Sequence, residues 1–272
     1  MSEYPVSIAI DDQEFKQFQQ LLLEKTGIFL SPVKKPLLTG RLNRRLRELG
    51  VRSYADYYRA IVLEEFPDEL QILINCLTTN ETAFFREPRH FDFLRDLCGR
   101  PEFLKRMVRV WCAAASSGEE PYSIAMVLAD TLRHDNWELI ASDVNSEVLD
   151  QARVGYYALQ RGADIPKHYL QRYCLKGVGQ HAGAFVIGPE LRGNIRFQRI
   201  NLVEPLPALG QFDVIFLRNA LIYFPADIKL HVIEQTRRFL KLGGHFIVGH
   251  SETLLGTVSD FKPVSPSIYR RI

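Results

Sequence analysis

A run of very small residues joins an expected strand to an expected helix in the segment WCAAASSGEEPYS, residues 111–123. The strand ends in three alanines, the chain passes Gly118, and a helix is expected from Pro121. Small side chains at such a turn allow a ligand to approach the backbone closely. The turn lacks the G-x-G-x-x-G pattern of dinucleotide-binding proteins and the lysine of a P-loop ATPase. On this segment alone, a ligand-binding turn and an ordinary tight turn of an α/β domain are equally good interpretations.

An acidic residue, Asp143, follows at the end of the next expected strand. In α/β domains that bind nucleosides, an acid in this position accepts hydrogen bonds from ribose hydroxyls. Asp143 is equally suited to cap the helix that follows it. Because the small-residue turn and the acid occur together, the sequence favours a cofactor that contains a nucleoside.

Two further polar segments could contribute to the same site. Residues 78–87, TTNETAFFRE, combine hydroxyl and amide groups with two phenylalanines and the fixed positive charge of Arg86. Residues 216–224, FLRNALIYF, begin at the carboxyl end of an expected central strand, where ligands of parallel sheets gather. A helix N-terminus also explains the threonines of the first segment, and Tyr223 in the second could be a packed interfacial tyrosine.

The elements that must position these segments are typical of a parallel sheet. Strands are expected where apolar residues cluster in short runs, and helices where they recur every three to four residues. Alternation of the two indicates a sheet covered by helices on both faces, which binds ligands beyond the carboxyl ends of its strands. The expected strands are 107–115, 137–142, 195–200, 212–217 and 245–249, and the expected helices are 121–130, 146–154 and 226–240.

The first 75 or so residues are instead expected to be helical. Asp11 and Glu14 have the spacing of a capping box, which predicts a helix from residue 12. Another helix is expected from about Pro32, with leucines along one side and Gly50 at its end. Arg45 falls close to the leucines, whereas the basic residues that project away from them are Arg41, Arg44 and Arg47.

Residues 165–194 interrupt the alternation of strands and helices. Several glycines surround the short apolar run AFVI at residues 184–187. This pattern predicts a small antiparallel insertion that leaves the main sheet as a hairpin.

The composition excludes several classes of protein. The chain has 272 residues, of which 46% are hydrophobic and 24% charged, so global disorder is excluded and one large or two modest domains are expected. A net charge of +2 gives no indication of a nucleic-acid partner. The four cysteines form no C-x-x-C pair, so neither a metal site nor a disulfide framework is expected. No apolar run is long enough for a membrane span, and the N-terminus Met-Ser-Glu-Tyr-Pro lacks a secretion signal, so a cytosolic protein is expected.

Four segments together resemble one family, the CheR chemotaxis receptor methyltransferases: TNETAFFRE, WCAAASSGEEPYS, ASDVNSEVLDQAR and FDVIFLRNALIYF. The resemblance runs from about Phe15 to Tyr269. It implies an α/β fold with a Rossmann-like class I S-adenosylmethionine (SAM)-dependent methyltransferase sheet in residues 79–272. It also implies an N-terminal helical domain for receptor recognition in residues 1–78 and a β-subdomain at about 165–194. The implied reaction transfers a methyl group from SAM to glutamate side chains of methyl-accepting chemotaxis proteins. The products are glutamate γ-methyl esters and S-adenosylhomocysteine, formed in sensory adaptation.

The resemblance also implies roles for individual residues. Arg86 and Tyr223 are expected nearest the transferred methyl group and the incoming carboxylate. The basic face of Arg41, Arg44 and Arg47 is expected to complement the glutamate-rich helices of the receptor. The expected cofactor contacts are Asn80, Thr82, Arg86, Glu120, Asp143, Asn201, Leu202, Arg218 and Asn219.

The implied chemistry requires positioning and no general base. A glutamate carboxylate has an ordinary pKa of about 4.3 and is already ionised at neutral pH. It is, however, a weak and well-hydrated nucleophile, so the site must hold it in line with the sulfonium–methyl bond. Such positioning can contribute about 7–11 kcal/mol in favourable cases. Arg86 and Tyr223 are therefore expected to orient the carboxylate.

The implied partners are the cytoplasmic helical domain of chemoreceptors and, through the β-subdomain, a C-terminal receptor pentapeptide bound by strand addition. A monomer recruited from the cytoplasm to membrane receptor arrays is expected. Alternatives are a SAM-binding sensor or scaffold without catalysis, and a methyltransferase for another protein substrate. An adenine methyltransferase would carry an Asn/Asp-Pro-Pro-Tyr motif where this chain has Arg218-Asn219-Ala220-Leu221.

Overall fold

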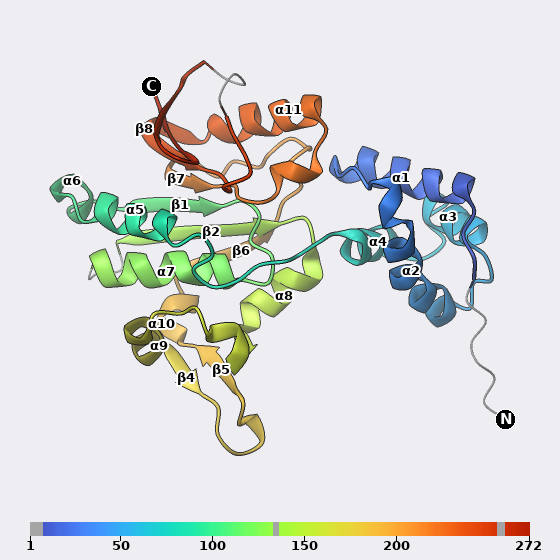
Figure 1. Cartoon of the computed structure of the whole chain (residues 1–272), viewed down its shortest axis with the longest axis horizontal. Coiled ribbons are helices and arrows are strands. Elements are labelled where there is room, and N and C mark those ends of the chain that lie inside the picture. The colour runs from blue at the N-terminus through green and yellow to red at the C-terminus, as the bar shows by residue number, and fades with distance from the viewer. Residues whose placement is uncertain (1–7, 133–135, 255–258) are drawn as a thin grey trace. The chain divides into compact units, whose positions relative to one another are not determined.

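The computed structural model describes residues 8–132, 136–254 and 259–272, which form two compact units (Figure 1). The first unit contains the described residues up to Thr79 together with Tyr223–Pro225, and the second contains Asn80–Ile222 and the described residues from Ala226 onward. The first five residues, on which the expected absence of a secretion signal depends, lie outside the described residues. No helix in the described ranges combines the length and the apolar character needed to cross a bilayer.

The first unit is helical, as its sequence predicts. Asp11 and Glu14 form the expected capping box, and Gly27 and Gly50 end two helices with left-handed backbone angles. The chain enters the second helix through a 3-10 turn, and Pro32 and Pro36 lie in first turns, where the missing N–H group of proline would have no helical partner in any case. The elements are α1 (Asp12–Thr26), the 3-10 turn η1 (Pro32–Lys34), α2 (Lys35–Leu49), α3 (Tyr54–Val62) and α4 (Glu69–Leu77).

Aromatic rings and an ion pair with the buried Glu69 hold the helices of the first unit together. The ring of Phe18 is fully buried and packs against the rings of Tyr54 and Tyr57. Arg45 lies close to the leucines of α2, as expected, and its Nη2 is 2.5 Å from Oε2 of the buried Glu69. The Tyr57 hydroxyl donates to the same carboxylate at 2.6 Å. The buried charges are therefore paired and hydrogen-bonded, which a stable interior requires.

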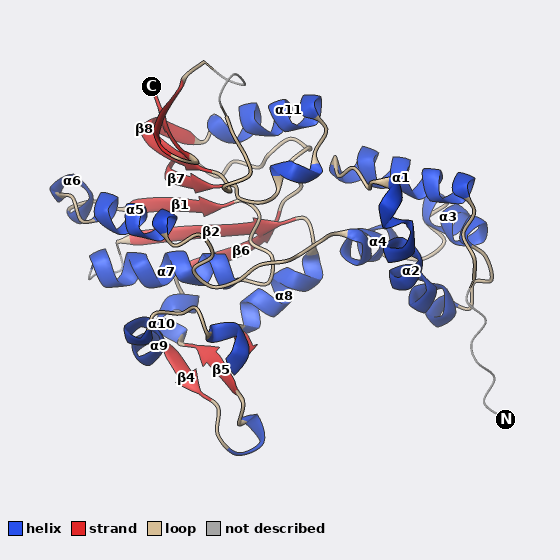
Figure 2. Cartoon of the chain, viewed as in Figure 1, coloured by secondary structure: helices blue, strands red, loops and turns tan. Residues whose placement is uncertain are grey.

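The second unit contains a seven-stranded sheet with the order β6-β2-β1-β7-β8-β10-β9. Figure 2 labels the five strands from β6 to β8. The first five of these strands are parallel, as expected, and the last two pair antiparallel. The final pair was not expected, because FKPVS at residues 261–265 contains a proline and buries one side chain, which is an edge-strand pattern. The strands are β1 (Val108–Cys112), β2 (Trp137–Asp143), β6 (Ile195–Arg199), β7 (Phe212–Phe216), β8 (Leu240–Ile247), β9 (Phe261–Ser265) and β10 (Ile268–Arg271).

Helices cover the sheet, and one of them is buried on nearly every side. In α7 the residues from Glu119 to Leu128 are all buried, because α5 and the sheet both pack against this helix. A helix buried all round carries no amphipathic stripe, so its length was underestimated from sequence. The helices of this layer are α5 (Arg89–Cys98), α6 (Pro101–Leu104), α7 (Glu119–Leu132), α8 (Ser146–Val154) and α11 (Ala226–Arg237).

The insertion is a three-stranded antiparallel sheet with the order β3-β5-β4. The apolar run AFVI is its central strand, β5 (Ala184–Ile187). The small sheet begins earlier than residue 165, because β3 (Tyr156–Ala158) follows directly after Gly155 ends α8. The other elements of the insertion are η2 (Leu159–Gly162), α9 (Lys167–Tyr173), β4 (Cys174–Lys176), η3 (Gly179–His181) and α10 (Pro189–Arg192).

The carboxyl ends of the three central strands lie level with one another. Cys112, the last residue of β1, is paired with Ala141 of β2 on one side and with Phe216 of β7 on the other. The small-residue turn, Asp143 and Arg218 follow these strand ends. The register therefore brings three of the polar segments identified in the sequence to one edge of the sheet.

Candidate functional site

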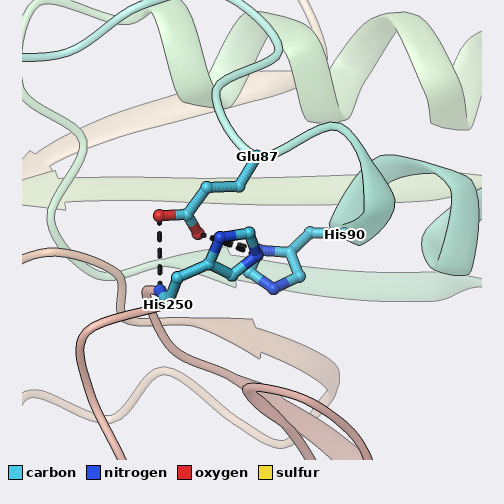
Figure 3. A group of neighbouring side chains, drawn as sticks. All are labelled: Glu87, His90 and His250. Carbon is cyan, nitrogen blue, oxygen red and sulfur yellow. Dashed lines mark hydrogen bonds and ion pairs between the residues drawn. The ribbon is translucent and has the colours of Figure 1, made fainter.

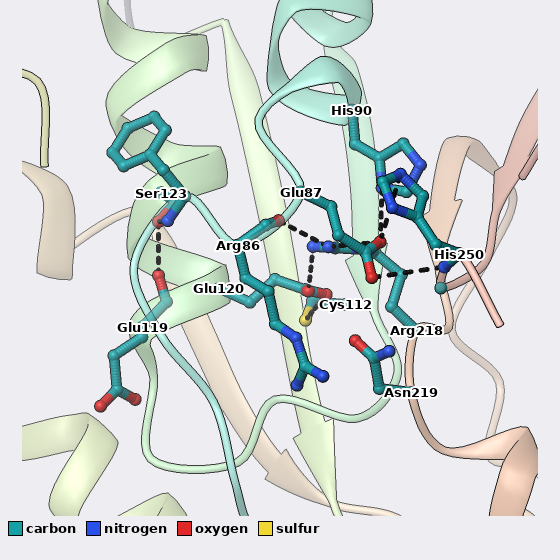
Figure 4. Close-up of polar contacts among 12 residues, drawn as sticks. Arg86, Glu87, His90, Cys112, Glu119, Glu120, Ser123, Arg218, Asn219 and His250 are labelled. Carbon is teal, nitrogen blue, oxygen red and sulfur yellow. Dashed lines mark hydrogen bonds and ion pairs between the residues drawn. The ribbon is translucent and has the colours of Figure 1, made fainter. Parts of the chain in front are cut away.

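A buried arginine organises the site at the end of β7. Arg218 has a fully buried side chain, and its two terminal nitrogens bond two carboxylates. Nη1 donates to Oε2 of Glu120 at 2.5 Å, and Nη2 donates to Oε2 of Glu87 at 2.9 Å and to the carbonyl of Arg86 at 2.6 Å. Figure 4 shows these contacts converging from three separate segments. We call Arg218, Glu87 and Glu120 the Arg218 cluster.

The charges of the Arg218 cluster perturb one another. Burial raises the pKa of Glu120, although the nearby guanidinium acts in the opposite direction. Burial also tends to raise the pKa of Glu87, but the hydrogen bond and charge of Arg218 outweigh it, so this pKa is lowered. Burial tends to lower the pKa of Arg218, and the two carboxylates raise it overall. With both acids ionised, the cluster has a formal charge of −1, which favours a cation beside it.

Arg86 lies next to this cluster in a strained turn formed by residues 85–87. Phe85 and Glu87 both have positive φ angles, 51° and 60°, which side chains other than glycine rarely adopt. The turn is attached to α7, because the Phe85 N–H donates to Oγ of Ser123 at 2.9 Å. The carbonyl of Arg86 faces Arg218, whereas its guanidinium extends away from the cluster (Figure 4). That guanidinium is exposed and donates to the carbonyl of Glu81 at 3.2 Å, so it is available to an anion.

Asn219, next to Arg218, is held by the loop that follows β8. Its N–H donates to Oε2 of Glu252 at 2.8 Å, and its φ is 55°. The same carboxylate oxygen accepts the N–H of Gly249 at 2.7 Å. A Cβ on Gly249 would lie 2.5 Å from Nδ2 of Asn219. Glycine is therefore needed at residue 249 for the Asn219 side chain to keep its place.

Asp143 is hydrogen-bonded to the small-residue turn. Oδ2 of Asp143 accepts the N–H of Ser116 at 2.8 Å, and Oδ1 accepts the N–H of Asn145 at 3.0 Å. Burial raises the pKa of Asp143, against the opposing effect of these backbone N–H groups. The N-cap of α8 is Asn145, which accepts the N–H of Val148. Asp143 is thus not the helix cap that the sequence left open.

The remaining expected cofactor residues of the second unit lie along the same edge of the sheet. The carbonyl of Asn80 accepts Oγ–H of Ser116 at 2.9 Å, which joins the segment at residue 80 to the turn that holds Asp143. Thr82 is half-buried two residues further on. Beyond β6, Asn201 donates to Oε1 of Glu204 at 2.9 Å, and Leu202 is buried.

Four expected site residues belong to the first unit. The carbonyl of Tyr223 accepts the N–H of Phe29 at 2.9 Å, and its ring lies 5.2 Å from Nζ of Lys34. On α2, Arg44 and Arg47 are exposed, and Arg44 is paired with Glu48 at 2.8 Å.

The fourth of these residues, Arg41, differs from the other two arginines of the basic face. It is half-buried, and its Nη1 donates to the carbonyls of Cys76 at 2.9 Å and Thr78 at 2.8 Å. These carbonyls lie at the end of α4, so Arg41 joins α2 to that helix end.

Several residues that shape the site gave no signal in the sequence. Glu87 lies in the segment TNETAFFRE but was assigned no role, and Glu252 lies 33 residues along the chain from Asn219, whose N–H it accepts. The Cys112 thiol donates to Oε1 of Glu120 at 3.3 Å, where the sequence indicated only a small buried residue. The contacts of Glu87 with Arg218 and of Glu252 with Asn219 join residues 131 and 33 positions apart, which no local pattern reports.

Comparisons with known proteins identify relatives of both units. Residues 80–269 match the family described as "CheR methyltransferase, SAM binding domain", and residues 13–78 match "CheR methyltransferase, all-alpha domain". Chemotaxis protein methyltransferase 2 of Pseudomonas aeruginosa is 40% identical over 260 residues, which are 94% of this chain and 92% of that protein. The chemotaxis protein methyltransferase of Escherichia coli is 40% identical over 248 residues, 90% of this chain and 86% of that protein. The Salmonella typhimurium protein of the same name is 38% identical over 265 residues, 96% and 91% of the two chains.

Proposed function

Because this chain belongs to the CheR methyltransferase family, we propose that it is a SAM-dependent protein-glutamate O-methyltransferase of chemotaxis receptors. It transfers a methyl group from SAM to glutamate side chains of methyl-accepting chemotaxis proteins. The products are glutamate γ-methyl esters and S-adenosylhomocysteine, and the reaction serves sensory adaptation.

The observation that carries this proposal is the extent of the similarity. Relatives named as chemotaxis protein methyltransferases are about 40% identical over 90% or more of this chain, including both the helical and the sheet-containing parts. A sensor or scaffold without catalysis is the less favoured alternative, because Arg86, Asp143 and Tyr223 are all present.

The donor set at the sheet edge fits a nucleoside cofactor. A carboxylate offers about four acceptor positions, so Asp143 can accept a ribose hydroxyl in addition to its backbone N–H groups. The turn beside it contains Ala113, Ala114 and Ala115, whose small side chains leave room for a ligand at the backbone. Further contacts are proposed for Asn80, Thr82, Glu120, Asn201, Leu202, Arg218 and Asn219.

The formal negative charge of the Arg218 cluster suits the cationic half of the same ligand. SAM supplies an activated methyl group on a positively charged sulfur. Glu120 and Glu87 together exceed the charge of Arg218 by one, so the cluster stabilises a cation near it. Arg218 also holds the backbone of Arg86 through a hydrogen bond, so it positions one proposed neighbour of the ligand.

Arg86 and Tyr223 are proposed to orient the carboxylate that receives the methyl group. Arg86 has an exposed guanidinium that engages only a backbone carbonyl among the hydrogen bonds described for it, and it can exchange that contact for a carboxylate. An exposed contact of this kind holds the substrate without the very tight ion pair that would stabilise its ground state and slow attack. No proton transfer is assigned to either residue, since the carboxylate is already ionised.

The helical domain, residues 1–78, is proposed to recognise the receptor, and residues 79–272 to perform the transfer. Exposed Arg44 and Arg47 on α2 provide charge complementary to glutamate-rich helices. The small sheet is proposed to bind a C-terminal receptor pentapeptide by strand addition, which its outer strand β4 allows. We place the protein in the cytoplasm as a monomer that is recruited to membrane receptor arrays.

Transfer of labelled methyl groups to receptor cytoplasmic domains tests the reaction directly. We expect base-labile incorporation into glutamate, and a loss of turnover of about 100-fold in Arg86→Ala, as for a misplaced reactant. Arg89→Ala is a matched control, because it removes another exposed arginine a few residues away. Near-normal turnover of Arg86→Ala with bound SAM would exclude the role given to Arg86. Absence of transfer to every receptor domain in a panel would exclude the proposed substrate class.

Calorimetric titration with receptor C-terminal pentapeptides tests the role of the small sheet. Leu175→Ser changes an exposed apolar residue of β4 (59% exposed) and is expected to weaken binding about fivefold, in proportion to the apolar area lost. Val154→Ser changes an equally exposed residue (58%) at the end of α8, outside the small sheet, and is the control. No heat with any pentapeptide would argue against strand addition here.

A further inference from the structure

Two histidines, His90 and His250, lie next to Glu87 of the Arg218 cluster (Figure 3). Glu87 ends the strained turn, His90 lies in the first turn of α5, and His250 follows β8. Their ligand atoms all lie within 4.8 Å of one another. Oε2 of Glu87 is 3.4 Å from Nδ1 of His90 and 3.9 Å from Nε2 of His250. We call these three residues the Glu–His–His site.

The two separations between Glu87 and the histidines are close to those between the ligands of a tetrahedral ion. Zinc–nitrogen and zinc–oxygen bonds of about 2.0–2.2 Å at a tetrahedral angle place neighbouring ligand atoms about 3.3–3.6 Å apart. The observed 3.4 Å and 3.9 Å require only small side-chain rotations to reach this range. His250 is half exposed, so the fourth coordination position would face water.

The environment of His90 is a second, independent indication of a ligand. His90 is 1% exposed, and neither of its ring nitrogens makes a hydrogen bond to any residue that the structure describes. A buried polar atom without a partner costs about 1–3 kcal/mol. Nδ1 points at the carboxylate of Glu87, but its 3.4 Å separation does not form a hydrogen bond. An ion between the three side chains would give this nitrogen a partner.

We propose that Glu87, His90 and His250 form a binding site for one transition-metal ion of the zinc, cobalt and nickel group. Two imidazoles and one carboxylate are a donor set that such ions prefer, whereas magnesium and calcium require mainly oxygen ligands. The guanidinium of Arg218 lies 2.9 Å from Oε2 of Glu87 and opposes a second cation there. The second carboxylate of the Arg218 cluster, Glu120, offsets this repulsion. An ion bound by two imidazole nitrogens also depends less on the charge of Glu87 than an ion bound by oxygen atoms alone.

A bound ion would join two segments that carry proposed site residues. Glu87 is next to Arg86, and His250 is next to Gly249, whose N–H shares the Glu252 carboxylate with Asn219. The ion would therefore fix the turn at residues 85–87 to the loop at residues 249–252. Binding of such an ion is a property beyond the proposed methyl transfer, and it can be measured without a methylation assay.

Metal titration of the full chain, freed of any affinity tag, tests the site. We expect Co²⁺ to bind with one-to-one stoichiometry and to give the visible absorption of a tetrahedral complex, and Zn²⁺ to displace it. We expect Mg²⁺ to produce no displacement. The melting temperature should rise by several degrees at a Zn²⁺ concentration 100 times the dissociation constant.

Matched histidine variants identify the ligands. His250→Ala removes a half-exposed side chain, so folding is expected to survive, and affinity for Co²⁺ should fall about 100-fold. His231→Ala removes an exposed histidine from α11 and should leave affinity unchanged. The proposal is overturned if one-to-one binding is absent. It is equally overturned if the two variants bind alike.

Discussion

The Arg218 cluster and the basic face of α2 use the arginine side chain in opposite ways. In the Arg218 cluster one arginine is fully buried and pairs with two carboxylates. On α2, Arg44 and Arg47 are exposed, and the ion pair between Arg44 and Glu48 lies at the surface. Removal of one partner from a buried ion pair leaves an unpaired buried charge and lowers stability strongly. An ion pair at the surface contributes little to stability. The first region should therefore govern folding and site geometry, and the second should act on encounters with a charged partner.

Removal of the buried guanidinium should have the largest effect. Arg218→Met leaves Glu120 buried without its partner and is expected to lower the free energy of unfolding by about 3–5 kcal/mol, with loss of methyl transfer. Arg44→Met should alter the free energy of unfolding by less than about 0.5 kcal/mol. Denaturant unfolding followed by circular dichroism measures both values. Similar losses at the two positions would remove the distinction between the regions.

Buried and exposed histidines extend the comparison to pH. His245 in β8 is 6% exposed, and burial, with Arg270 and Arg100, lowers its pKa to about 4. Because an unfolded histidine has a pKa of about 6.5, the unfolded chain takes up the proton first, and stability falls as pH drops from about 6.5 to 4. At about 1.4 kcal/mol per pH unit, this histidine contributes a loss of about 3 kcal/mol over that range.

The variant His245→Leu cannot take up this proton, so its stability should fall less steeply with acid. Urea unfolding between pH 7 and pH 4 measures the slope, with His231→Leu on the surface of α11 as the control. Parallel pH curves for wild type and His245→Leu would show that His245 does not contribute to acid sensitivity.

Charge reversal on α2 should affect the partner and leave the fold intact. Arg44→Glu with Arg47→Glu is expected to lower kcat/KM for receptor domains about tenfold at low salt, and less at high salt, because screening weakens surface charges. A reversal of exposed Lys262 and Arg270 gives the same change in net charge in the other unit and serves as the control. Unchanged receptor methylation at physiological salt would exclude recognition by this face.

Arg41 should behave as a structural residue within the same basic helix. Its two hydrogen bonds to the carbonyls at the end of α4 predict that Arg41→Ala lowers the free energy of unfolding by about 1 kcal/mol. Arg47→Ala should change it by less than about 0.5 kcal/mol. Thermal unfolding of the two variants, measured together, separates them. An equal response would mean that the contacts of Arg41 add nothing to stability.

Local patterns predicted much of the fold. The three-residue spacing of Asp11 and Glu14 predicted the start of α1, and Ser146 and Val154 were predicted as the limits of α8. Such helix and strand patterns involve only residues that are close together in the chain, so they can be recognised from the sequence. The placement of Asp143 at a strand end was predicted for the same reason.

Long-range contacts could not be predicted in this way. Arg218 and Glu120 are 98 residues apart, and His250 lies 163 residues from Glu87. Only the register of the sheet and the path of its loops bring such residues together. Arg41 shows the same limit, because helical spacing placed it on an exposed face while a carbonyl pair 35 and 37 residues away engages it.

The assignment of Tyr223–Pro225 to the helical unit has a consequence for protein engineering. A hybrid enzyme made by exchanging only the part before Thr79 would combine a helical unit from one parent with the Tyr223 peptide of the other. The hydrogen bond from Phe29 to Tyr223 would then join residues of different ancestry. An exchange of the whole helical unit therefore calls for three junctions, after residues 79, 222 and 225, so that residues 223–225 are transferred together with the helices.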